Sequence, residues 1–166
     1  RDDPRVSVTE SAYAAAAAHD AAVREVVSDA DEAMQSVARA LKTIDVVSGW
    51  TRHLPETEAF DDLSDSLRTA LTDIQAMYST PSSFKGYDHV TRRISDAVWT
   101  AMGRNDWVNG PGENARRALA VAASEVSRLV AKTDDVMNGL WSDWVTAAEA
   151  LDRSPEQLFE ALGTPD

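Results

Sequence analysis

Residues 23–44, VREVVSDADEAMQSVARALKTI, decide the fold class of this chain. Apolar residues recur there at alternating steps of three and four, which aligns them along one side of a helix packed in a bundle. They are Val27, Ala30, Met34, Val37, Leu41 and Ile44. Ser7 or Thr9 with Glu10 can start this helix, and Gly49 is a natural stop. The pattern therefore predicts one helix of roughly 40 residues, about 60 Å long.

The same spacing returns three times along the chain. It predicts a second helix over residues 55–78, opened by Pro55, and a third that carries Tyr87 to Ala101. A loop with the sequence NDWVNGPG follows at residues 105–112. After it, Leu119 to Leu151 predict a long fourth helix.

These helices predict an all-α protein, an up-down-up-down antiparallel four-helix bundle. Helices one and four are long and helices two and three are shorter. Residues 1–166 are expected to form a single domain, with residues 1–8 as a flexible N-terminal arm. The sequence SPEQ at 154–157 is a capping box, so residues 154–163 are predicted to form a short C-terminal helix.

An alanine-rich stretch, SAYAAAAAHDAA at residues 11–22, is predicted to be an ordered helical surface because alanine is the strongest helix former. In the expected topology the long helices extend beyond the short ones, so residues 10–25 lie beside residues 136–151 as a two-helix stalk. Indole rings there can pack on the alanines and still leave apolar surface exposed. The predicted partner-binding residues are Tyr13, Trp141, Trp144 and Phe159. Alternatively, the C-terminal helix covers this surface through Leu158, Phe159 and Leu162.

Composition excludes several function classes. Sixteen Lys and Arg against 28 Asp and Glu give a net charge of -12, which disfavours nucleic acid and anionic membranes as partners. The absence of cysteine excludes disulfides, thiolate metal sites and cysteine nucleophiles. No apolar run is long enough to insert into a membrane. The sequence favours a cytoplasmic protein that has no cofactor. Its expected partner is another protein or a second copy of itself.

The sequence lacks the motifs typical of catalysis and metal binding. A di-iron bundle needs paired Glu-x-x-His motifs, and none of the three histidines has a glutamate three residues before it. His19 is followed by Asp20, but such a pair on a helix is expected to be a surface or capping group. We therefore predict no metal ligand and no catalytic residue.

Five arginines near the third and fourth helices form one candidate ligand site, with anion-binding guanidinium groups on a single hairpin. They are Arg92, Arg93, Arg104, Arg116 and Arg117. The alternative is that these arginines pair with the many acidic residues nearby, or that Arg104 complements the C-terminal end of a helix.

The sequence favours a non-catalytic helical-bundle module for protein–protein interaction or assembly, acting through the Ala/Trp-rich half of helices one and four. One alternative is a ligand-sensing receptor domain, possible also outside the cytoplasm. Another is a small all-α enzyme that binds an anionic substrate at the arginines.

Overall fold

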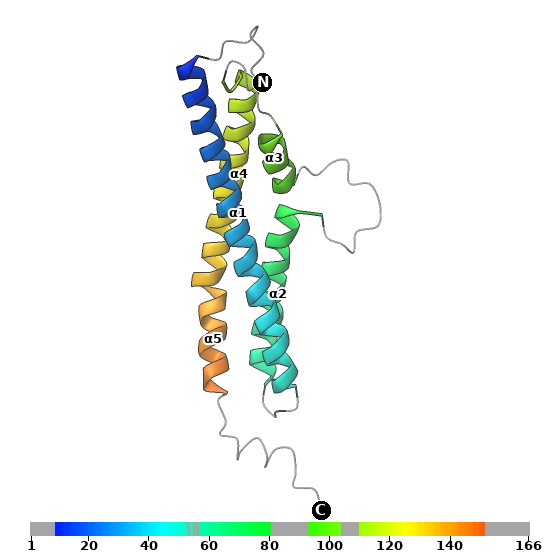
Figure 1. Ribbon diagram of the computed structural model, residues 1–166. Coiled ribbons are helices and arrows are strands. Elements are labelled where there is room, and N and C mark those ends of the chain that lie inside the picture. The colour runs from blue at the N-terminus through cyan, green and yellow to red at the C-terminus, as the bar shows by residue number, and fades with distance from the viewer. Residues whose placement is uncertain (1–8, 53, 55–56, 81–92, 104–109, 152–166) are drawn as a thin grey trace, which may run out of the picture. The chain divides into compact units, whose positions relative to one another are not determined.

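A computed structural model describes residues 9–52, 54, 57–80, 93–103 and 110–151 (Figure 1). Every regular element in these ranges is a helix, and the predicted all-α class with bundle packing is confirmed. The helices are α1 (Glu10–Thr51), α2 (Glu58–Tyr78), α3 (Ile94–Met102), α4 (Glu113–Asn138) and α5 (Leu140–Ala150). α4 and α5 are two parts of one long bent helix, interrupted at Gly139, so the four predicted helices are present.

The chain divides into two compact units, and α1 contributes to both. The first unit contains Arg1–Met34 and Gln75–Ala131, and the second contains Gln35–Ile74 and Lys132–Asp166. Each unit has its own buried core and is described by itself. A single domain over residues 1–166 remains a prediction.

In the first unit, α1, α3 and α4 meet through small side chains. Ala97 and Ala101 of α3 and Ala122 of α4 form a buried cluster, against which Val26 of α1 packs. Alanine at each contact allows helix backbones to approach closely. Arg93, just before α3, ties this helix to the end of α2 by donating a hydrogen bond of 2.6 Å from Nη1 to the carbonyl oxygen of Ala76.

The helix directions in the first unit correct part of the predicted topology. Gly110, just before α4, lies against Ala12 at the beginning of α1, because a Cβ built on it would be 3.3 Å from the Ala12 carbonyl oxygen. Further along both helices, Ala122 and Val26 belong to the same packed group. α1 and α4 therefore run in the same direction, whereas an up-down-up-down bundle makes them antiparallel. A connection of a few residues forces the next helix to run antiparallel to the one before it. Residues 79–93 separate α2 from α3, and a connection of this length does not impose that direction.

In the second unit, α1 and α2 form an antiparallel hairpin, in which Arg68 of α2 makes an ion pair with Asp45 of α1. α5 packs on α2, with the ring of Trp144 centred 5.5 Å from that of Phe60. The buried apolar residues of this unit are Val37, Ala40, Ile44, Phe60, Leu67, Leu71, Ile74, Val136 and Trp144.

The buried side of α1 differs in detail from the predicted one. Ala33 is 7% and Ala40 2% exposed, while Met34 and Leu41, which the sequence pattern favoured, are only half-buried. Helices come closest where side chains are smallest, so the alanines occupy the contact and the larger residues flank it. The predicted arm at residues 1–8, the first part of the third helix and the C-terminal helix at 154–163 lie outside the described residues.

Candidate functional site

Trp144 is a core residue, so its predicted role as an exposed partner-binding residue is wrong. It is 2% exposed, lies against Phe60, and donates a hydrogen bond of 2.8 Å from Nε1 to Ser64 Oγ. Ser64 is itself buried and donates to the carbonyl oxygen of Phe60 at 2.8 Å. The indole therefore finds both its apolar and its polar partners on α2, where the sequence pattern gave no sign of them.

Of the other two aromatic residues predicted at this end, one is half-buried and the other lies outside the described residues. Trp141 stacks on Trp144 with ring centroids 5.2 Å apart and is half-buried. Its ring thus extends the aromatic core outwards and presents only part of its surface. Phe159 lies outside the described residues.

Tyr13 is exposed, as predicted, and lies at the head of an exposed alanine surface. Its side chain is 73% exposed. Ala14, Ala17, Ala18 and Ala21 are exposed as well, all within helix α1. We call these five residues the Tyr13 face.

The predicted pairing of the alanine run with residues 136–151 is wrong. Ala12 and Ala15 have Gly110 as their neighbour in the first unit, and a Cβ on Gly110 would lie 3.5 Å from Ala15 Cβ. Trp144 packs on α2 in the second unit. The physical reason is the shared direction of α1 and α4, which places the beginning of α4 beside the alanines.

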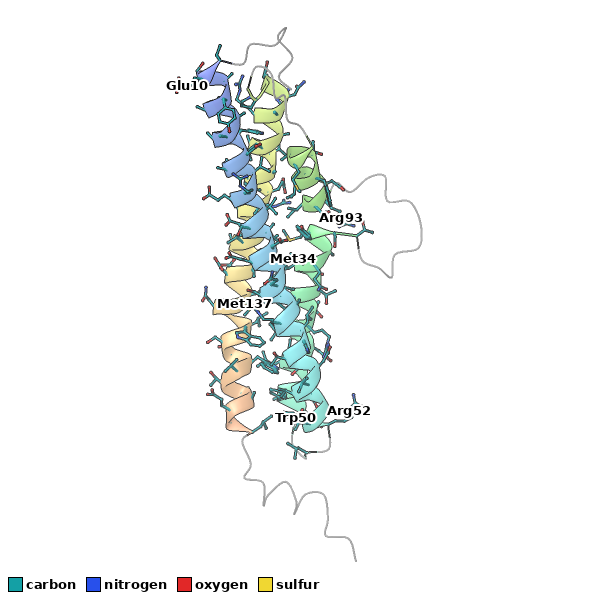
Figure 2. All side chains as sticks on the ribbon, in the orientation of Figure 1. Glu10, Met34, Trp50, Arg52, Arg93 and Met137 are labelled. Atoms are coloured by element: carbon teal, nitrogen blue, oxygen red, sulfur yellow. The ribbon has the colours of Figure 1, made fainter. Side chains whose placement is uncertain are left out.

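Arg93 and Arg116 each bind a backbone carbonyl group. Arg93 donates to Ala76 in the last turn of α2, where carbonyl groups lack helical partners (Figure 2). Arg116 donates from Nη1 to the carbonyl oxygen of Pro111 at 2.9 Å. Both contacts are structural, since each guanidinium group binds a carbonyl oxygen of the chain itself.

The remaining arginines do not complete an anion site among the described residues. Arg117 is exposed near the beginning of α4. Arg92 and Arg104 lie outside the described part of the chain. Whether five guanidinium groups converge thus remains a prediction.

His19 is buried, contrary to the expectation of a surface group. It is 6% exposed, and its Nε2 atom has no hydrogen-bond partner among the residues that the structure describes. It lies on the side of α1 that also carries buried Ala30. No group of three or more His, Asp or Glu side chains in the described ranges could hold a metal ion.

Two large exposed aromatic residues were not predicted from the sequence. Trp50 near the end of α1 is 73% exposed, and Trp99 on α3 is 70% exposed. Tryptophan is usually well buried, so such exposure is informative. The exposure of Trp50 could have been predicted from its place on the helix. It lies outside the buried stripe of α1, one turn after Val46, which is also exposed.

Within the described ranges, no helix combines the length and the apolar character that crossing a membrane requires. No family model, curated protein or solved structure matches the chain.

Proposed function

We propose that this chain is a protein–protein interaction or assembly module, which binds a partner or a second copy through the Tyr13 face of α1. The observation that supports this most is the exposure of Tyr13, 73%, at the head of alanines that are exposed on an already formed helix. Tyrosine is favoured at interface hot spots because it buries a large area with few rotatable bonds.

Alanine suits the neighbourhood of such an anchor. Its small side chain lets the backbone of a second helix approach at the short end of the usual 8–10 Å interaxial range. The segment is helical before binding, so association does not pay for ordering it. A flat face with one aromatic anchor is therefore well suited to accept a helix.

Charge favours one kind of partner over another. Glu10, Asp20, Glu25 and Asp29 lie on or beside the same stretch of α1, with Arg24 as the cation among them. A partner helix with basic flanks gains from these carboxylates, whereas a second copy brings like charges together. We therefore expect a basic partner to bind more tightly than a second copy.

The test combines two measurements on the intact chain. Light scattering over about a hundredfold range of concentration, a span wide enough to shift a dimer equilibrium, detects self-association. A photo-crosslinking amino acid at position 17, on the face, is compared with the same group at exposed Val121 of α4. We expect a crosslinked protein at position 17 that is absent at position 121 and is lost in Tyr13→Ser.

The result that contradicts the proposal is a monomer at every concentration with identical crosslinks at both positions. The receptor and enzyme alternatives remain predictions. Thermal shift with millimolar phosphate or dicarboxylates tests anion binding, because a ligand that binds only the folded state raises its stability. Arg117→Ala abolishes that shift if the arginines form the site.

A further inference from the structure

A second exposed face lies on α1, within the second unit. Val46 is 43% and Trp50 73% exposed, one helical turn apart. Arg39 and Lys42 continue this line at steps of three and four, and both are exposed. These four residues, which we call the Trp50 face, point away from the buried side that carries Ala40 and Ile44.

The Trp50 face is cationic in an otherwise acidic protein. Arg52 follows directly after α1, and Figure 2 shows it at the same end of the helix as Trp50. The acidic residue of this stretch, Asp45, makes an ion pair with Arg68 of α2. Among the described residues, neither Lys42 nor Arg52 has an ion-pair partner. An apolar strip with free positive charges therefore faces outwards.

Residues 152–166 have the complementary composition. Leu158, Phe159 and Leu162 fall on one side of the helix that the capping box predicts for residues 154–163. Glu156 lies at the edge of that side, whereas Glu160 lies nearly opposite to it. The whole segment carries four acidic residues, Asp152, Glu156, Glu160 and Asp166, against Arg153 alone. It is acidic and amphipathic, and such a segment is able to bind a cationic, apolar helix face.

The segment starts at the same end of the second unit as Trp50 (Figure 2). Trp144 packs beside the beginning of α2, and α5 ends at the same end of the second unit as the turn between α1 and α2 (Figure 1). An extended chain spans about 3.4 Å per residue and a helix about 1.5 Å, so the three steps from Leu151 to Ser154 and the four helical steps to Leu158 cover up to about 16 Å. That is about one and a half times the diameter of a helix.

We propose that residues 154–163 dock as an amphipathic helix on the Trp50 face, with Phe159 and its leucine neighbours against Val46 and Trp50. A tethered segment acts at an effective concentration in the millimolar range. A second copy lacks this advantage and adds a further charge of -12. The inference concerns the second unit and is independent of the Tyr13 face.

The test uses the full chain with fluorinated tryptophan. Trp50→Phe and Trp99→Phe assign two ¹⁹F signals, and Trp99, 70% exposed in the first unit, serves as the matched control. In Leu158→Ser/Phe159→Ser, we expect the Trp50 signal to move and its quenching by acrylamide to rise to the level of Trp99, which itself stays unchanged. An unchanged Trp50 signal overturns the proposal.

Charge reversal gives a second, independent readout. Glu156→Lys, at the edge of the apolar side, is expected to release Trp50, and the further change Arg39→Glu/Lys42→Glu is expected to restore its protection. Protection must not depend on protein concentration. Protection that disappears on dilution assigns the face to a second copy and overturns the docking of this segment. Tyr13→Ser leaves all these signals unchanged, so failure here is distinguishable from failure of the proposed function.

Discussion

The indole of Trp144 donates a 2.8 Å hydrogen bond to Ser64 Oγ inside the core of the second unit. Both residues are buried, at 2% and 3% exposure. The serine hydroxyl in turn donates to the carbonyl oxygen of Phe60, the residue whose ring packs on the same indole. One polar contact and one aromatic contact thus fix α5 on α2.

Replacing Ser64 with alanine leaves the indole N–H unpaired in an apolar environment. We expect the free energy of unfolding to fall by about 1–3 kcal/mol, the usual cost of a buried unsatisfied group. Urea denaturation measures this loss. Ser66→Ala is the matched control, because Ser66 also donates to a helix carbonyl, that of Asp62, but is exposed. Equal effects at the two serines would show that the indole does not depend on Ser64.

Truncation of Trp144 should lower the free energy of unfolding strongly, and truncation of Trp99 should hardly change it. Trp144→Ala removes a core side chain and is expected to cost about 3–5 kcal/mol in unfolding free energy. Trp99→Ala removes an exposed one and should stay within about 0.5 kcal/mol. Chemical denaturation of both variants tests the burial assignment. A large loss at Trp99 would mean that its side chain is covered in solution.

Gly110 has a positive φ angle of 77°. Alanine there is expected to cost about 1–2 kcal/mol for the left-handed conformation, and its Cβ would also press on the Ala12 carbonyl oxygen at 3.3 Å. Thermal unfolding measures the loss. Gly112→Ala is the control, because a Cβ there meets nothing within 4 Å. Equal effects would show that the close approach to α1 is absent.

Arg93 should stabilise the junction between α2 and α3. A hydrogen bond from a charged donor contributes about 1.5–3 kcal/mol, so Arg93→Ala is expected to speed amide exchange in α3 by about tenfold or more. Hydrogen–deuterium exchange at Ala97 and Val98 reads this directly. Arg117→Ala should leave the exchange in α3 unchanged. Equal protection in both variants contradicts the role of Arg93.

Tyr78 should make the stability of the folded protein depend on pH in the alkaline range. Burial, and then the nearby negative charge of Asp31, raise the pKa of its hydroxyl above the ordinary value of 10.0. The folded state therefore holds this proton more tightly than the unfolded state. The resulting stability is present below pH 10 and is lost as pH rises through the folded-state pKa.

Tyr78→Phe should remove this part of the dependence. Unfolding free energies at about pH 9 and about pH 11, on either side of the tyrosine range, are expected to differ less in the variant than in the parent chain. Asp31→Asn should remove only the smaller, electrostatic share. Identical slopes in Tyr78→Phe and the parent would contradict the raised pKa.

The local pattern determined the helices. Steps of three and four between apolar residues predicted α1, α2 and the long last helix, because a helix places such residues on one side whatever it packs against. Tyr13 was predicted as a partner-binding residue from the two-helix stalk and not from this spacing. Composition alone established the acidic character that guides the choice of partner.

Only the tertiary structure decided which faces meet. The direction of α3 after a longer connection is not encoded in periodicity, and it placed Gly110 rather than Trp144 beside the alanines. The burial of Trp144 and the exposure of Trp50 follow from which neighbours α2 and α5 present. A helix sequence states which side is apolar, but the partner of that side depends on contacts between segments distant in the chain.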